Sequence, residues 1–234
     1  MAAVTLLEAR GLTHRFGGLT AVRGVDFDLQ QGECHALIGP NGAGKTTLVS
    51  LLSGRLPVQT GAIRFAGQDI TRLPAHRRVR RGIAYTFQIT SVYAGLSVAE
   101  NAGLAIQSRG GAEAEVSAAL ARVGLQDLAE TRAGALSYGH QRLLEVAMGL
   151  ALHPRLLILD EPTQGLAAGE IGRFKDLVAG LTPEITVLLI EHNMEVVMDL
   201  ARRITVLNFG EVLATGTPGA IRANAAVQAA YLGG

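Results

Sequence analysis

The sequence of 234 residues is poor in cysteine, lysine and aromatic side chains. It contains one cysteine, no tryptophan and only 4% aromatic residues. A single cysteine excludes an internal disulfide bond, so Cys34 fits a small buried residue in a protein of a reducing compartment. With so few aromatics and a net charge of +1, the composition gives no indication of nucleic-acid binding.

Long apolar runs are also missing, although 48% of the residues are hydrophobic. A membrane-spanning helix needs about 18 or more consecutive apolar residues, and the sequence has no such run. The N-terminus lacks the basic and then apolar order of a signal peptide. We therefore expect a cytoplasmic protein whose link to a membrane runs through a partner.

Glycine, in contrast, is abundant, and residues 39–46 fit the Walker A pattern G-x-x-x-x-G-K-S/T. In such a loop, backbone N–H groups surround phosphates, Lys45 reaches the β- and γ-phosphates, and the Thr46 hydroxyl binds Mg²⁺. A glycine-rich turn that binds nothing is the alternative. An apolar run before the loop and helix-like spacing after it favour phosphate binding. The expected nucleotide ligands are Gly39, Pro40, Asn41, Gly42, Ala43, Gly44, Lys45, Thr46 and Thr47.

A second pattern is a run of apolar residues, Leu156–Leu159, that ends in the acids Asp160 and Glu161. A buried strand here would bring Asp160 beside the phosphate loop, where its carboxylate can hold Mg²⁺. Glu161 would then polarise a water for in-line attack on the γ-phosphate. Taken alone, the pattern also fits a strand with solvated acids at its exit, but the phosphate loop upstream favours the catalytic interpretation.

The hydropathy pattern predicts an α/β fold with two kinds of β-structure. Residues 5–29 alternate as an antiparallel layer would, and 61–67 adds a strand to it. Residues 97–152 are rich in Ala, Glu, Leu and Arg, which predicts helices, with breaks near 110–111 and 134. Buried strands of a mainly parallel sheet are predicted from short apolar runs at 83–88, 156–160, 186–191 and 204–209.

Leu136-Ser137-Tyr138-Gly139-His140-Gln141-Arg142 lies between the phosphate loop and the two acids. By itself, Ser137 fits an ordinary helix N-cap. In this order, however, the segment resembles the L-S-G-G-Q motif of the ATP-binding subunits of ABC transporters. The resemblance implies that Ser137 and Gly139 bind the γ-phosphate of an ATP held by a second subunit, because a helix N-terminus attracts phosphate.

Three further residues follow the order of that family. Phe16 matches the aromatic residue that stacks on adenine, Gln88 matches the glutamine that touches Mg²⁺ and the attacking water, and His192 matches the histidine that contacts the γ-phosphate. The resemblance covers essentially the whole chain. It implies ATP and Mg²⁺ as cofactors, Lys45, Gln88, Glu161 and His192 as catalytic residues, and Thr46, Gln88 and Asp160 as metal ligands.

The resemblance also implies the architecture. We expect a P-loop NTPase with a RecA-like core, an antiparallel β layer on the N-terminal side and an inserted helical subdomain. The whole chain, 1–234, would be a single domain. Its core would comprise about 1–88 and 153–234, and its helical subdomain about 89–152.

Three positions depart from the family pattern. Tyr138 and His140 replace a glycine and a glutamine of the L-S-G-G-Q motif. Ala167 stands where the segment after the two acids often carries an aspartate, which bears on how two nucleotide sites communicate.

Within the family, several segments are similar to the ATPases of branched-chain amino acid importers. They are 87–90, 96–101, 136–139, 190–194, 204–210 and the C-terminal end from 220 to 233. The expected function is ATP hydrolysis that powers uptake of branched-chain amino acids. The alternatives are uptake of urea or short amides, export of lipopolysaccharide, and a non-transport role on DNA or ribosomes. A GTPase is excluded, because neither Lys45 nor Lys175 follows the asparagine of an N-K-x-D guanine reader.

The expected partners follow from the same resemblance. A second ATPase subunit, identical or homologous, would face this one head to tail, and both would dock on transmembrane permease subunits. A periplasmic or extracellular solute-binding protein would be an indirect partner, and nucleic acid would not be one. The protein would then lie peripherally on the cytoplasmic side of the membrane.

The run Arg77-Arg78-Val79-Arg80-Arg81 is the most basic segment of the chain. It predicts a solvated helix face before the strand at 83, with contact to lipid headgroups as the alternative.

Overall fold

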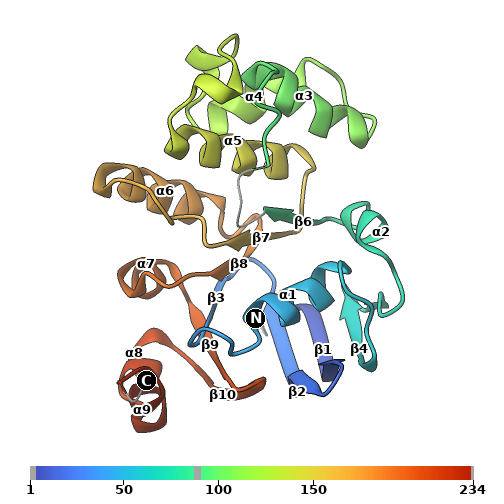
Figure 1. Ribbon diagram of the computed structural model, residues 1–234. Helices are drawn as coiled ribbons and strands as arrows, with labels where there is room; N and C mark the ends of the chain where they lie inside the picture. The colour runs from blue at the N-terminus through green and yellow to red at the C-terminus, as the bar shows by residue number, and fades with distance from the viewer. Residues whose placement is uncertain (1–3, 87–90, 233–234) are drawn as a thin grey trace.

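The computed structural model describes residues 4–86 and 91–232. In these residues, two β-sheets lie side by side, and a separate group of helices sits at one end (Figure 1). This is the predicted α/β fold. Across the same ranges, no helix has both the length and the apolar character needed to cross a membrane.

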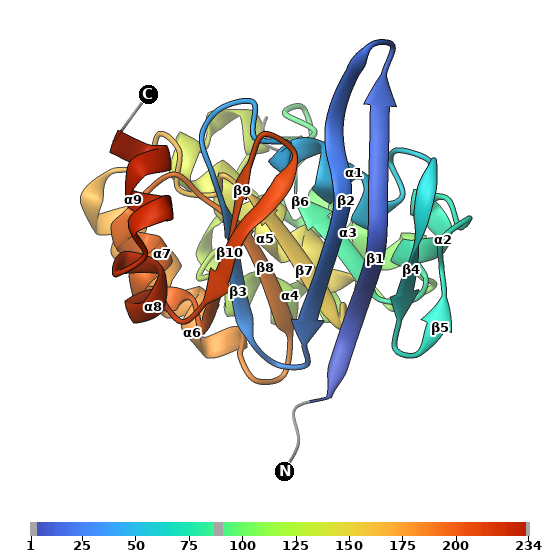
Figure 2. The same ribbon diagram turned by 90° about the horizontal axis from the view of Figure 1, so that it is seen from below.

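The smaller sheet is antiparallel, as the alternation along 5–29 predicts. Its first two strands form a long hairpin (Figure 2), and the strand order is β2-β1-β4-β5. Leu7, Ala9 and Leu12 of the first strand are fully buried on one face. The strands are β1 (Thr5–Phe16), β2 (Leu19–Gln30), β4 (Thr60–Phe65) and β5 (Gln68–Asp69).

The larger sheet has the order β10-β9-β3-β8-β7-β6 and is parallel except at β10, which pairs antiparallel with β9. Because both of its faces are covered, the central strands are buried throughout and mostly apolar rather than alternating. The strands are β3 (Cys34–Ile38), β6 (Ile83–Thr86), β7 (Leu156–Asp160), β8 (Thr186–Ile190), β9 (Arg203–Asn208) and β10 (Glu211–Gly216).

The helices of residues 98–151 pack on one another at the top of Figure 1, above β6 and β7. Two of them begin at serine N-caps. The hydroxyl of Ser97 accepts from the N–H of Glu100, and that of Ser137 accepts from the N–H of His140. The helices are α1 (Lys45–Ser53), α2 (Ala75–Val79), α3 (Val98–Ser108), α4 (Glu115–Arg122), α5 (Tyr138–Ala151), α6 (Ala168–Leu181), α7 (Met194–Leu200), α8 (Pro218–Arg222) and α9 (Ala225–Leu232), with 3₁₀ turns η1 (Gln126–Leu128) and η2 (Ala133–Ala135).

Two apolar cores cover the two faces of the larger sheet. On one face, Leu48, Leu51 and Leu52 of α1 fill the space between the two sheets. On the other face, α6 and α7 pack on the sheet together with α5. Cys34 belongs to this second core, where burial raises the pKa of its thiol to about 12, so it is an inert buried residue as predicted.

The prediction of a solvated arginine helix at 77–81 is wrong for one residue. Arg78 is only 1% exposed, and its guanidinium donates to the carbonyls of Leu51 (2.7 Å), Leu52 (2.8 Å), Leu73 (2.8 Å) and Thr71 (3.1 Å). Two of these carbonyls, those of Leu51 and Leu52, lie in the last turn of α1, where carbonyls lack the full set of donors found inside a helix. Spacing along a short helix does not reveal such acceptors, because they come from another part of the chain.

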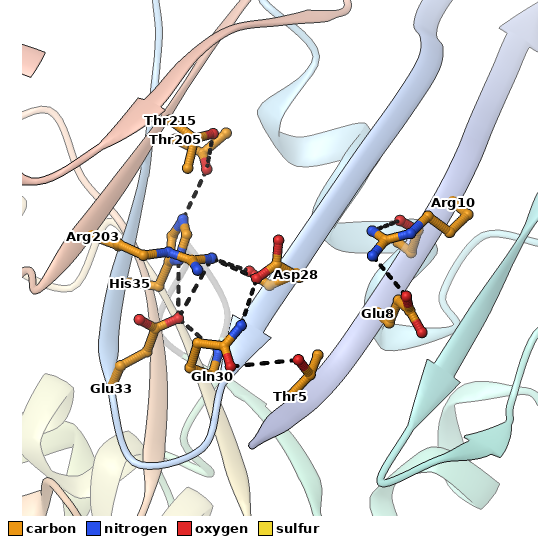
Figure 3. Close-up of polar contacts among 11 residues, drawn as sticks. Thr5, Glu8, Arg10, Asp28, Gln30, Glu33, His35, Arg203, Thr205 and Thr215 are labelled. Atoms are coloured by element: carbon orange, nitrogen blue, oxygen red, sulfur yellow. Dashed lines mark hydrogen bonds and ion pairs between the residues drawn. The ribbon is translucent and has the colours of Figure 1, made fainter. Parts of the chain in front are cut away.

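A buried polar network joins the two sheets (Figure 3). His35 of β3 is completely buried, with Nδ1 3.2 Å from Glu33 Oε1 and Nε2 2.8 Å from the Thr205 hydroxyl. Arg203 of β9 donates to the carboxylate of Asp28 on β2 at 2.8 Å. The network therefore links β2 of the small sheet to β3 and β9 of the large one.

The charges in this network settle the protonation of the imidazole. Burial alone raises the pKa of Glu33, but hydrogen bonds from His35 and from the backbone N–H of Gln30 outweigh it and lower that pKa. An ionised Glu33 can only accept, so Nδ1 of His35 carries the proton, and Nε2 accepts from Thr205. Burial also lowers the pKa of His35, despite the opposing effects of Glu33 and Asp28, so the ring is neutral.

We expect acid to weaken the fold through His35. The unfolded histidine takes up a proton as pH falls below about 6.5, whereas the folded one does not, so stability is present above that pH and lost below it. From pH 7.5 to 5.5 the loss should be on the order of 1 kcal/mol in the free energy of unfolding. Urea unfolding at both pH values measures it. His35→Gln should lack this loss, while the exposed His76→Gln should keep it. An equal pH dependence in His35→Gln and the wild type would contradict the assignment.

Candidate functional site

An open cleft of about 580 Å³ lies where strands of the larger sheet end. The loop between β3 and α1 forms one wall, and the ends of β7 and β8 form another. The mouth is framed by the hairpins of β1–β2 and β9–β10. The lining residues are Phe16, Leu19, Thr20, Ala21, Arg23, Asn41, Gly42, Ala43, Gly44, Lys45, Thr46, Thr47, Glu161, Ile190, His192, Phe209 and Gly210.

The predicted phosphate loop has the backbone that its glycines allow. Gly44 caps α1 with φ of 100°, and a Cβ there would collide with the carbonyl oxygen of Ala21. Gly39 lies equally close to the carbonyl of Leu207. The loop thus leads directly into α1, whose first N–H groups and positive dipole end face the cleft.

The ammonium of Lys45 is held inside this loop. Its Nζ donates to the carbonyls of Gly39 at 2.6 Å and Pro40 at 3.0 Å. Burial lowers the pKa of Lys45, while the nearby carboxylates of Glu161 and Asp160 oppose the shift. The arrangement places a positive charge inside a glycine-rich loop, where it can pair with phosphate oxygens.

Asp160 is buried at the end of β7 and accepts from the Tyr85 hydroxyl at 2.5 Å. Burial raises the pKa of Asp160, partly opposed by this hydrogen bond, and Glu161 raises it further. The donor set of Asp160 and Thr46 fits Mg²⁺, which prefers oxygen ligands and is commonly held by one or two protein groups together with phosphates and waters. Tyr85 is a residue that the sequence pattern did not single out, because its partner is 75 residues away.

Glu161 and His192 meet across the cleft. Their side chains approach to 3.1 Å between Oε1 and Nε2, although they are 31 residues apart. Glu161 has a φ of 48°, a conformation that residues other than glycine rarely adopt, and its N–H donates to Ile190 at 2.8 Å. The two residues therefore form the carboxylate–imidazole pair that can orient and deprotonate a water.

Glu191 is a further site residue that the sequence pattern missed. It is buried, and its Oε1 accepts from the N–H (2.9 Å) and hydroxyl (2.5 Å) of Thr163. Its Oε2 accepts from the N–H groups of His192 (2.9 Å) and Asn193 (3.0 Å). One carboxylate thus ties the segment after β7 to the segment that carries His192.

Phe16 stands at the mouth of the cleft with 49% of its surface exposed, and its ring lies edge-on to His14 at 4.6 Å between centroids. Phe209, which the sequence analysis did not select, also lines the cleft and is 83% exposed. Its φ of 46° marks a tight turn between β9 and β10. An exposed aromatic ring at each hairpin gives the mouth flat surfaces suited to a planar base.

Ser137 and Gly139 do not line this cleft in the described part of the chain. They lie at the start of α5, where Tyr138 and Gly139 lie against the segment that precedes and begins α6. Gly139 faces the carboxylate of Glu170, and Gly165 lies against the ring of Tyr138. Two of the departures, Tyr138 and Ala167, therefore belong to neighbouring segments, since Glu170 also accepts from the N–H of Ala167 at 2.9 Å. Gln88 lies outside the described residues.

A family model described as ABC transporter matches residues 22–164, and one described as branched-chain amino acid ATP-binding cassette transporter matches residues 211–234. The chain is 42% identical to the high-affinity branched-chain amino acid transport ATP-binding protein BraF of Pseudomonas aeruginosa and 40% identical to LivG of Escherichia coli. Both alignments cover 97% of this chain and 98% of the relative.

A solved structure gives the same result. The ADP conformation of an ATP-binding cassette of an ABC transporter matches with a TM-score of 0.90 and 27% identity. The match covers 99% of this chain and 100% of that one. The fold expected from the resemblance, a P-loop ATPase with a mainly parallel sheet, is thereby confirmed.

We expect Glu191→Gln to lower the kcat for ATP hydrolysis about tenfold with little change in KM. The amide keeps one acceptor oxygen for four donors, and leaving buried donors unpaired costs about 1–3 kcal/mol, which would misplace His192. Steady-state ATPase kinetics at saturating nucleotide measure it. The matched control is Glu195→Gln, whose exposed side chain only contacts Lys175 at 3.2 Å. A rise in KM at constant kcat would contradict a positioning role.

Proposed function

The chain belongs to the ABC transporter family of ATP-hydrolysing subunits, and we propose that it powers the uptake of branched-chain amino acids through a membrane permease. The observation that carries the proposal is the match to importer ATPases along nearly the full length of the chain, including residues 211–234 at the C-terminal end. The ATPase cleft alone supports transport of any solute, because it is common to the family. The choice of solute therefore rests on the relatives.

The proposed catalytic roles follow the cleft. Lys45 and the loop from Gly39 to Thr47 bind the phosphates, while Phe16 supports the adenine base. Glu161 removes a proton from the attacking water, and His192 holds that water and the γ-phosphate in line. Gln88 is assigned to the same water and the metal by its position in the sequence.

Thr46, Asp160 and Gln88 are the proposed ligands of Mg²⁺. The ion would neutralise charge on the β- and γ-phosphates. Tyr85 would keep the Asp160 carboxylate oriented toward it, because its hydroxyl already occupies Oδ2.

A second ATPase subunit completes each site in this proposal. Ser137 and Gly139 lie away from the cleft of their own chain, so they can reach a γ-phosphate only across a dimer interface. The N-terminus of α5 offers the phosphate a serine hydroxyl, free N–H groups and a positive dipole end. Two ATP molecules would then hold two chains together, and hydrolysis would release them.

The remaining partners are a permease and a solute-binding protein. No helix in residues 4–86 and 91–232 can cross a membrane, so a transporter role requires transmembrane subunits from other chains. The ATPase would sit peripherally on the cytoplasmic side and receive the signal of a loaded binding protein through the permease.

We expect ATP-dependent uptake of leucine when the chain is reconstituted in liposomes with its permease and solute-binding protein. Radiolabelled leucine, isoleucine and valine should accumulate, and urea should not. Lys45→Ala should abolish uptake, because it removes the phosphate-binding ammonium. ATP-dependent urea accumulation without leucine uptake, or outward transport of lipopolysaccharide, would contradict the proposed uptake of branched-chain amino acids.

We expect Glu161→Gln to form a stable dimer with Mg·ATP but not with Mg·ADP. The amide cannot take the proton of water, so ATP persists between the two subunits. Static light scattering measures the molar mass of the protein in the presence of each nucleotide. Lys45→Ala in the same background is the control and should stay monomeric. A Glu161→Gln protein that remains monomeric with Mg·ATP would contradict the assignment of Glu161 as the general base.

A further inference from the structure

A basic cavity of about 440 Å³ lies on the molecule apart from the nucleotide cleft. It is bounded by the turn from α2 to β6, the end of α3 and the loop from α5 to β7, where Figure 1 shows α5 returning to the sheet. Its lining residues are Val79, Arg80, Arg81, Gly82, Ser108, Arg109, Leu152, His153 and Arg155. No aspartate or glutamate is among these described residues.

The backbone fixes two of the arginines next to each other. The carbonyl of Gly82 accepts from the N–H groups of Arg155 (2.8 Å) and Leu156 (2.9 Å), which joins the start of β6 to the start of β7. Gly82 has a φ of 96°, and a Cβ there would press on the backbone and side chain of Arg155. Arg81 and Arg155 therefore lie just before two neighbouring strands, β6 and β7.

Another part of the lining is an ion-pair cluster. Arg109 donates to the carbonyl of Ala151 at 2.6 Å and pairs with Glu115. His153 lies 3.4 Å from the same carboxylate and 3.2 Å from Arg109, with a φ of 50° that fixes its turn. The carboxylate of Glu115 therefore pairs with Arg109 and not with Arg80, Arg81 or Arg155.

Within residues 4–86 and 91–232, no carboxylate lies within 4.0 Å of the guanidinium of Arg80, Arg81 or Arg155. Arg81 donates to the neutral Gln68, and Arg155 lies over the ring of Phe65 at 5.7 Å from its centroid. Like charges that converge on one cavity repel one another, and an anion placed among them relieves this repulsion. A planar guanidinium group can donate two parallel hydrogen bonds to two oxygens of one phosphate.

We propose that this cavity binds a phosphate group, carried either by a soluble phosphate ester or by the headgroup of an anionic lipid. Arg80 and Arg155 contact the phosphate, and Arg81 adds to the positive field. The site is separate from ATP hydrolysis, because it lies at the amino ends of β6 and β7, whereas Asp160 is the last residue of β7 and Glu161 follows it. Five strand residues separate the two ends by about 16 Å.

The test uses the full chain in a Lys45→Ala background, so that the phosphate loop contributes little to binding. One arm titrates inorganic pyrophosphate by calorimetry. The other measures cosedimentation with vesicles of phosphatidylglycerol and phosphatidylcholine against phosphatidylcholine alone. The probing variant is Arg80→Gln with Arg155→Gln, and the charge-matched control is Arg72→Gln with Arg77→Gln, which are exposed and do not line the cavity.

We expect the probing variant to lose at least about tenfold in affinity in one arm, because two charge-assisted contacts are removed, while the control stays within about twofold. The arm that responds identifies the source of the phosphate. Equal losses in both double variants would mean unspecific attraction to basic charge, and absence of binding in both arms would mean no site. Either result overturns the proposal.

Two checks keep the test independent of folding and of catalysis. In the chain with Lys45 restored, the probing variant should keep its basal ATPase rate, since neither arginine belongs to the nucleotide cleft. Loss of the Arg155 contact with Phe65 can weaken the fold, so Arg80→Gln alone is compared with Arg77→Gln alone. If the double variant does not fold, a single variant Arg80→Gln that binds as well as Arg77→Gln overturns the proposal.

Discussion

The parallel pairing of β3, β8 and β7 is the constraint on which the site depends. Leu37 pairs with Ile190, and Ile190 pairs with Asp160, so the three strands end at the same edge of the sheet. The phosphate loop follows β3, the two acids close β7, and Glu191 and His192 follow β8. Parallel strands run in the same direction, so the segments that follow them begin at the same edge of the sheet. The side chains of these segments therefore lie close together in space although they are far apart in the sequence.

Buried polar side chains stabilise the segments that the parallel strands place next to one another. Glu191 fixes the two segments after β7 and β8 through four hydrogen bonds. Arg78 satisfies the carbonyls at the end of α1, the helix that begins at the phosphate loop. In both cases a single buried side chain is satisfied by several hydrogen-bond partners, and such groups are costly to disturb because unpaired donors or acceptors would remain.

The two ends of the larger sheet serve different purposes in this protein. At the carboxyl ends of its strands, glycine-rich backbone and acids are close together, which suits phosphate and a divalent cation. At the amino ends, β3 and β9 are joined to the small sheet through His35 and Arg203, and β6 and β7 begin beside a cluster of arginines. Charge thus differs sharply between the two ends of one sheet, although its central strands are mostly apolar.

The sequence by itself determined the motifs and part of the secondary structure. Glycine spacing in residues 39–46, the apolar run before Asp160 and the alternation along 5–29 are local patterns, and local patterns reflect backbone geometry directly. Only the tertiary structure decided which distant residues meet: Tyr85 with Asp160, Glu191 with Thr163, and the burial of Arg78 within a run that looks solvated. The physical reason is that the partners of these groups come from other strands and helices, and sequence spacing carries no record of contacts made across the fold.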